Sequence, residues 1–143
     1  MNPADFQVRA ADWNTEQAAL RAVRTAVFVR EQGVSLELEW DGRDVSAIHV
    51  LAADHRQTPI GTARMLPDGH IGRMAVLAAW RRRGVGSTLL LKLLKDARDG
   101  GLNRVFLNAQ THAVPFYGRH GFRVIGDPFT DAGIPHLRMI RDL

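Results

Sequence analysis

The segment Arg81-Arg82-Arg83-Gly84-Val85-Gly86-Ser87-Thr88 holds the residues whose types and spacing point most clearly to a chemical site. It joins a predicted strand to a predicted helix, where unpaired backbone N–H groups and the helix dipole favour an anion. Glycine at positions 84 and 86 lets the backbone approach a diphosphate closely. The segment lacks the lysine spacing of a P-loop and the third glycine of a dinucleotide fingerprint. It predicts a pyrophosphate site of another type, although a glycine turn beside a solvated basic patch fits the same residues.

Proton chemistry in this chain falls to carboxylates, six histidines and a single tyrosine, because there is no cysteine. The phenol of Tyr117 has an ordinary pKa near ~10, so it stays protonated at neutral pH and suits a proton donor. Aromatic packing beside Phe116 is the alternative interpretation of Tyr117. The histidines at positions 49, 112 and 136 show no spacing typical of a metal triad, so we predict no metal site.

Length and composition limit the class of protein. The 143 residues amount to one ordinary domain, and no apolar stretch approaches the ~20 residues of a membrane-spanning helix. Of the 19 basic residues 17 are arginines, yet the formal net charge is only +4, which does not indicate a nucleic-acid-binding protein. The first ten residues lack a basic and apolar leader. We therefore expect a single domain over residues 1–143, located in the cytoplasm.

The hydrophobic pattern of the first third of the chain predicts a strand and then a helix. Residues 6–10 alternate between apolar and polar, as a half-buried strand does. A helix is predicted from Asn14, which resembles the first residue of a capping pair, to the stop at Gly33. Residues 34–45 are acidic, which favours a loop or a loose second helix.

The rest of the chain alternates strands and helices. Residues 49–53, 60–66 and 71–77 are β-prone runs separated by turn residues, which predicts an antiparallel meander. The glycine loop then leads into a helix with a leucine-rich apolar face, which ends at Gly100. The last predicted elements are a strand over 105–110, a short helix over 115–120, and closing strands over 122–125 and 136–140.

The glycine loop and its flanks resemble the GCN5-related N-acetyltransferase (GNAT) superfamily. The acetyl-CoA loop of that family has the pattern Arg/Gln-x-x-Gly-x-Gly/Ala, which Arg81, Gly84 and Gly86 match. Residues 71–76 are similar to the family's fourth strand, whose end binds the pantetheine arm through its backbone. Downstream, the Asn-x-x-Ala, Phe-Tyr and Gly-Phe signatures are matched in order and spacing, with Gln110 in place of the usual asparagine.

Two further motifs resemble a small bacterial branch of the family. They are Val-Phe-Val-x-Glu-Gln at residues 27–32 and Gly-Ile-Pro-His at residues 133–136. Most members of that branch have no assigned acceptor, so this likeness indicates the fold more than the substrate.

The resemblance implies roles for individual residues. Tyr117 is the implied acid for a departing thiolate, and backbone amides near Val76 would polarise the thioester carbonyl. Glu31 is our candidate for the catalytic base, although an ion pair in the last turn of a helix fits Glu31 as well. The implied cofactor-binding residues are Met74, Ala75, Val76, Arg81, Arg82, Arg83, Gly84, Val85, Gly86, Ser87, Thr88, Asn108, Gln110, Phe116 and Tyr117.

The acceptor side has fewer signals. The predicted substrate-binding residues are Gln32, Glu39, Asp41 and Arg73. Clustered acids at positions 37, 39, 41 and 44 would attract a cationic amine, whereas a solvated acidic loop is the simpler interpretation. Asn108 and Gln110 share one face of their predicted strand, so both reach the cofactor or both bridge splayed strands.

These observations predict an α/β (α+β) fold with a GNAT-like twisted mixed β-sheet of six or seven strands, flanked by about four helices. The resemblance implies an enzyme, an acetyl-CoA-dependent N-acetyltransferase that moves an acetyl group directly to a primary amine of a small molecule or protein. A non-catalytic acyl-CoA-binding sensor is the alternative. A nucleic-acid module is less favoured, so neither nucleic acid nor a membrane is a predicted partner, and a homodimer is left open.

Overall fold

The computed structural model describes residues 5–143, with their side chains at all positions except 37 and 38, so the first four residues of the predicted leader-free start lie outside it. Its strands form one sheet in the order β1-β2-β3-β4-β5-β7-β6, which confirms the predicted mixed sheet. The strands are β1 (Phe6–Ala11), β2 (Ile48–Asp54), β3 (Pro59–Met65), β4 (His70–Val76), β5 (Arg104–Gln110), β6 (Arg123–Asp131) and β7 (Ile134–Asp142). The helices are α1 (Trp13–Arg24), α2 (Leu36–Glu39), α3 (Val85–Asp99) and α4 (Val114–Arg119).

Helices cover both faces of the N-terminal strands. Every residue from 60 to 65 in β3 is buried, as expected for a strand between two helical layers. On one face Leu20 of α1 packs against Leu51 of β2. The opposite face is covered by the leucine-rich side of α3, which is fully buried as predicted at Leu89, Leu90, Leu93 and Leu94.

Helix α1 starts earlier than predicted and changes type after its end. The carboxylate of Asp12 accepts a hydrogen bond from the Asn14 amide at 3.0 Å, so Asp12 rather than Asn14 is the N-cap. The chain continues as a π-helix, η2 (Thr25–Glu31), whose wider turn packs Val27 against Ala75 of β4. The apolar spacing predicted one continuous α-helix, because a repeat every three or four residues does not distinguish the two helix types over so short a run.

The segment over 34–45 agrees with expectation, whereas the closing strands are longer than predicted. The acidic segment contains the short α2 and a 3₁₀ turn, η3 (Asp44–Ser46), which agrees with a loop or a loose helix. Strands β6 and β7 extend well beyond the predicted 122–125 and 136–140. The pairing of β6 with β7 skips from Ile125 to Phe129, so the Gly-Asp-Pro run over 126–128 is a bulge within the strand.

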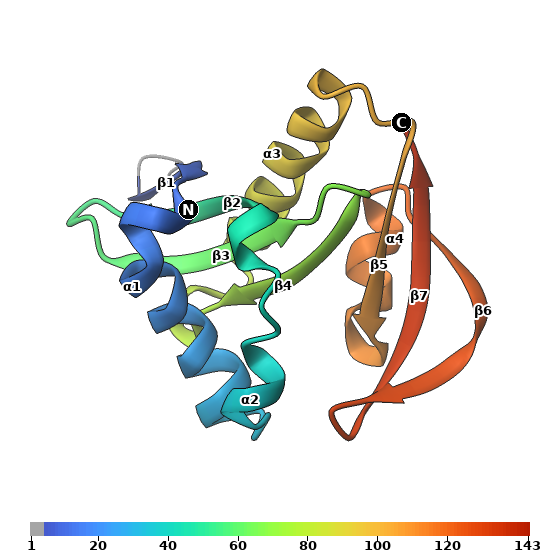
Figure 1. The fold of residues 1–143 in the computed structure, drawn as a ribbon, viewed down its shortest axis with the longest axis horizontal. Coiled ribbons are helices and arrows are strands. Elements are labelled where there is room, and N and C mark those ends of the chain that lie inside the picture. The colour runs from blue at the N-terminus through green and yellow to red at the C-terminus, as the bar shows by residue number, and fades with distance from the viewer. Residues whose placement is uncertain (1–4) are drawn as a thin grey trace.

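Strands β4 and β5 separate soon after they meet. They pair in parallel at residues 70–71 with 106–107, and beyond these the described residues form no further pair between the two strands. Figure 1 shows β5, β7 and β6 turned away from β1 to β4. Strand β4 also bulges against β3, and Arg73 within the bulge has a φ of 49°. One edge of β4 therefore has backbone groups that face the space between the two halves of the sheet.

Candidate active site

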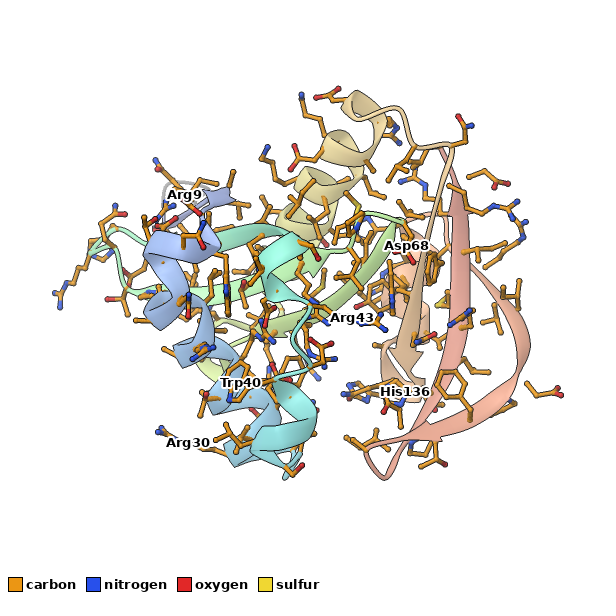
Figure 2. The ribbon with its side chains drawn as sticks, in the orientation of Figure 1. Arg9, Arg30, Trp40, Arg43, Asp68 and His136 are labelled. Carbon is orange, nitrogen blue, oxygen red and sulfur yellow. The ribbon has the colours of Figure 1, made fainter. Side chains whose placement is uncertain are left out.

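The separation of β4 and β5 opens a cleft of about 1050 Å³. Its walls come from η2, β4, the first turn of α3, the end of β5, α4 and the turn between β6 and β7. The two branch motifs meet in it, with Phe28 and Gln32 on one wall and Ile134 and His136 on another. Figure 2 shows His136 beside the end of β5.

Most of the predicted cofactor-binding residues line this cleft. Arg83 and Thr88 do not: the Arg83 guanidinium lies over the Trp80 ring at 5.1 Å, and the Thr88 hydroxyl donates to the Gly84 carbonyl oxygen at 2.8 Å. The predicted residues that line the cleft are Met74, Ala75, Val76, Arg81, Arg82, Gly84, Val85, Gly86, Ser87, Asn108, Gln110, Phe116 and Tyr117.

The first turn of α3 presents backbone donors to the cleft. Gly84 is the N-cap residue with a φ of 83°, a left-handed conformation that glycine adopts without strain. The Thr88 amide donates to the Gly84 carbonyl at 3.0 Å, so the amides of residues 85–87 precede the first bond of the helix. A Cβ on Gly86 would lie 3.4 Å from the Phe116 ring, so a side chain at this position would contact that ring. The turn is suited to bind a phosphate group.

The end of β4 adds another donor. The Leu77 amide donates to the Ile60 carbonyl at 2.9 Å. In an antiparallel pair, adjacent residues of one strand point their backbone groups in opposite directions, so the residue before Leu77 points its groups away from β3. Val76 therefore directs its N–H and C=O away from β3, toward the open edge of β4. Its carbonyl accepts a hydrogen bond from Arg81 Nε at 3.0 Å, and its amide faces the cleft.

Arg81 and Glu31, predicted to serve the cofactor and catalysis respectively, bind each other. Two hydrogen bonds of 2.6 Å join the guanidinium to the carboxylate. The pair is exposed, at 39% for Arg81 and 43% for Glu31. The hydrogen bonds from Arg81 hold the pKa of Glu31 below its ordinary value, which makes this carboxylate a weaker base. The structure thus gives Glu31 an ion-pair partner, Arg81, that the sequence pattern did not indicate.

Tyr117 lies between aromatic rings and the sulfur of Met74. Its ring meets Phe116 and Phe122 edge to face at 5.0 and 5.9 Å, and its hydroxyl donates to Met74 Sδ at 3.7 Å. Burial raises the pKa of Tyr117 to about 12. The aromatic packing that the sequence left as one alternative is therefore present, and Tyr117 also lines the cleft.

A reciprocal amide pair joins the two walls of the cleft. Gln110 Nε2 donates to Gln32 Oε1 at 2.9 Å, and Gln32 Nε2 donates to Gln110 Oε1 at 3.4 Å. Gln32 follows η2 and Gln110 ends β5, so this contact ties the predicted acceptor wall to the predicted cofactor wall.

The predicted acidic entrance is a compensated cluster of ion pairs. Burial raises the pKa of Glu39, although the charges of Arg24 and Arg73 act to lower it. Asp41 is not among the residues that line the cleft, and Asp44 is buried. The side chain at position 37 lies outside the described residues. These carboxylates face arginines, so they do not present the free negative charge that an entrance for cationic amines requires. We call the set the ionic cluster, and it consists of Arg24, Arg64, Arg73, Glu39, Asp41 and Asp44.

The histidines fall into separate environments. His49 lies in the core, where it stacks on Trp13 at 5.0 Å, while His112 and His136 line the cleft. Sequence reasoning missed His70, which lines the cleft, and His120, whose Nε2 lies 3.0 Å from Ser87 Oγ in the first turn of α3. No motif marks either residue, because a lone histidine gives no spacing to recognise.

Neither a metal-binding cluster nor a membrane-spanning helix is present among the residues that the structure describes. Across residues 5–143, no group of three or more His, Cys, Asp or Glu side chains is arranged to hold a metal ion. None of the helices in that range has the length and apolar character needed to cross a bilayer.

Comparison with known proteins agrees with this architecture. A model of the acetyltransferase (GNAT) domain matches residues 13–143. The chain is 44% identical over 124 residues to the uncharacterized N-acetyltransferase YjcF of Bacillus subtilis, covering 84% of this chain and 88% of that protein. An acyl-CoA N-acyltransferase from Pseudomonas aeruginosa superposes with a TM-score of 0.81 at 31% identity, covering 95% of this chain and 99% of that one. Escherichia coli ElaA gives a TM-score of 0.84 at 29% identity, with coverage of 95% and 99%. The resemblance seen in the sequence is confirmed, and the chain belongs to the GNAT acetyltransferase family.

Proposed function

We propose that the protein transfers an acetyl group from acetyl-CoA directly to a primary amine of a small molecule or protein, in the cytoplasm. The observation that carries this proposal is that the open edge of β4 and the first turn of α3 face one cleft. The strand edge offers amides to an extended pantetheine arm, and the helix turn offers N–H donors to a pyrophosphate. Membership of the family supports an acyl-CoA as donor.

The residues of this cleft fit acyl-CoA in shape and chemistry. A Cβ on Gly84 would meet no atom within 4 Å, so the backbone there borders open space. The amides of residues 85–87 and the side chain of Arg82 would hold the pyrophosphate. The backbone of β4 from Met74 to Val76 would bind the pantetheine amides.

The bound cofactor supplies an acetyl group activated as a thioester. The Val76 amide would donate to the carbonyl oxygen, and the Tyr117 hydroxyl would give its proton to the sulfur. In the transfer, the bond from the amine nitrogen to the carbonyl carbon forms as the carbon–sulfur bond breaks. The nitrogen loses one proton to water and the sulfur gains one from Tyr117, which water then reprotonates.

Glu31 has more support as a residue that holds the cleft wall in position than as the catalytic base. Its bidentate contact with Arg81, together with the Arg81 bond to the Val76 carbonyl, connects η2, β4 and the glycine loop. A carboxylate with a lowered pKa removes a proton from an alkylammonium poorly. We propose that the acceptor binds as the neutral amine and that Glu31 fixes the wall beside it.

The test is a calorimetric titration with acetyl-CoA followed by an acetylation assay against a panel of primary amines. We expect acetyl-CoA to bind and coenzyme A to compete, with free thiol released only in the presence of amine. Binding with no turnover across a broad panel would instead favour the sensor alternative. Failure of acetyl-CoA to bind would contradict the cleft assignment itself.

A further inference from the structure

A second hollow lies beside the cleft, under the bulge of β6. It measures about 360 Å³ and is lined by Asn108, Ile125, Gly126, Asp127, Phe129 and Arg138. We call it the β6 hollow. Figure 1 shows β6 arching away from β7 at this point. The hollow is formed because the pairing of β6 with β7 skips from Ile125 to Phe129.

One residue borders both the β6 hollow and the cleft. Asn108 lines both spaces. Within the sheet, Asn108 lies opposite Arg138, and Gln110 lies opposite His136. Residues 108 and 110 are on the same face of β5, so the two pairs are separated by roughly 7 Å along the strand. A molecule whose one end lies beside Gln110 can therefore place its other end in the hollow.

The charge of Arg138 is available in this hollow. Its guanidinium lies over the Phe106 ring at 5.2 Å, and its Nε donates to Asn108 Oδ1 at 3.2 Å. Among the side chains that the structure describes, no carboxylate lies within ion-pair distance of Arg138, and this includes Asp127 of the same hollow. The guanidinium is thus oriented by neutral groups, unlike the arginines of the ionic cluster.

Two of the side chains that line the hollow are apolar, beside the polar Asn108 and Asp127. Ile125 is 36% exposed and Phe129 is 37% exposed, and the Phe129 ring stacks on His136 at 5.8 Å. His136 also lines the cleft, so an apolar surface leads from the cleft to Arg138. A short hydrocarbon chain would be stabilised along this path by the surface that it removes from water.

We propose that the β6 hollow binds an anionic group of the acceptor, a carboxylate or a phosphate, whose amine lies in the main cleft. The inference rests on the proposed function, and it defines the acceptor as an amine joined to an anion by a short apolar chain. Arg138 binds the anion, Asn108 orients Arg138, and Ile125 with Phe129 contacts the chain. The spacing along β5 sets the length of the preferred acceptor.

The experiment compares acceptors that differ only at the far end. Wild-type protein is assayed with hexylamine, 6-aminohexanoate, 6-aminohexyl phosphate and glycine, the last being too short to span the two positions. We expect kcat/KM for at least one of the two long anionic amines to exceed that for hexylamine and glycine about tenfold or more, as a charge-assisted hydrogen bond provides. The two anionic amines distinguish a carboxylate site from a phosphate site.

The variants locate the effect. Arg138→Gln keeps a hydrogen-bond donor for Asn108 but removes the positive charge. We expect this variant to lose the preference for the anionic amine through a higher KM for that amine. The affinity for acetyl-CoA and the rate with hexylamine should stay within twofold of wild type. Arg56→Gln, the same change at an exposed position in the β2–β3 connection, should behave as wild type. Equal preference in wild type and Arg138→Gln would overturn the proposal.

A binding measurement separates this inference from the proposed function. The better anionic amine is titrated by calorimetry into wild type and Arg138→Gln, each saturated with coenzyme A. Arg138-dependent binding supports the hollow even if no amine is acetylated, in which case only the proposed function fails. Absence of binding to wild type counts against the hollow as an acceptor site. The same conclusion follows if Arg138→Gln sediments differently from wild type but still binds the anion.

Discussion

The two arginine-rich regions beside the cleft use their charges in opposite ways. In the ionic cluster, three guanidinium groups face three carboxylates inside the protein, and Arg24 is only 1% exposed. In the loop over 81–88, Arg81 and Arg83 are turned toward Glu31 and Trp80, and the groups left open to the cleft are backbone amides and the Arg82 side chain. An excess of arginine therefore does not by itself indicate a phosphate site, whereas the first turn of a helix facing a cleft does.

The difference follows from where each charge lies. A guanidinium that leaves water must be compensated, because the desolvation of a buried ion costs several kcal/mol. The cluster meets this requirement and joins the segment containing α2 and η3 to α1, β3 and β4. The amides at the start of α3 remain accessible, so they can exchange water for a ligand. One region serves stability and the other is suited to binding.

Removal of Arg24 should have the largest effect of all the substitutions on folding stability. If stability hardly changed, the contrast between the two arginine-rich regions would not hold. Arg24→Ala leaves Glu39 and Asp44 buried without their shared partner, and loss of one member of a buried pair costs about 3–5 kcal/mol. Urea unfolding should show this as a lower midpoint. Lys95→Ala, which removes an exposed pair on α3, is the control and should leave the midpoint unchanged. A small loss in Arg24→Ala would mean that water reaches the cluster.

Tyr117→Phe should have the largest effect on turnover. The substitution keeps the ring contacts with Phe116 and Phe122 but removes the proton donated toward Met74 Sδ. We expect kcat to fall about 100-fold or more, the lower end of the usual contribution of a general acid, with acetyl-CoA affinity nearly unchanged. Unchanged turnover would assign Tyr117 to packing alone and would leave the cleft without an identified proton donor.

The pH profile gives an independent check on the same residue. Because burial raises the pKa of Tyr117 to about 12, the acid form is lost only as the pH rises through that value. The rate with an alkylamine should therefore rise with pH as the amine loses its proton, with no fall up to pH ~10. A descending limb between pH 8 and 10 in wild type, absent in Tyr117→Phe, would show that the phenol titrates much lower.

Two matched glycine variants sharpen the assignment of the loop. Gly84 and Gly101 flank α3, both have φ near 83–84°, and a Cβ on either would meet nothing within 4 Å. Alanine at each position should cost about 1–2 kcal/mol of folding stability for the left-handed conformation. Only Gly84→Ala should weaken acetyl-CoA binding, by about tenfold or 1.4 kcal/mol, because only Gly84 lines the cleft. Equal affinities in the two variants would move the cofactor away from this turn.

Short-range patterns in the sequence predicted the helices, strands and turns that depend on them. Features that depend on contacts between distant parts of the chain were missed. The leucine face of α3, the antiparallel meander and the glycine turn follow from short-range spacing, and each is found. The π-helix and the β6 bulge were missed because they arise from packing between elements. Likewise, no pattern indicates that Arg81 pairs with Glu31, 50 residues earlier in the chain, or Gln110 with Gln32. Residue roles were therefore less predictable than residue positions.

Glu31→Gln should have the smallest effect and decides between the two roles of this side chain. As a brace on the surface, the Glu31–Arg81 pair contributes little, since exposed ion pairs are worth about 0–1 kcal/mol. We expect kcat and acetyl-CoA affinity to stay within about threefold of wild type at neutral pH, measured by steady-state kinetics and calorimetry. A catalytic base would behave differently, with a 100-fold loss of kcat that a higher pH restores as the amine loses its proton to solvent. That result would mean that Arg81 leaves Glu31 once the cofactor binds, and the glycine loop would then hold one more arginine free for the phosphates.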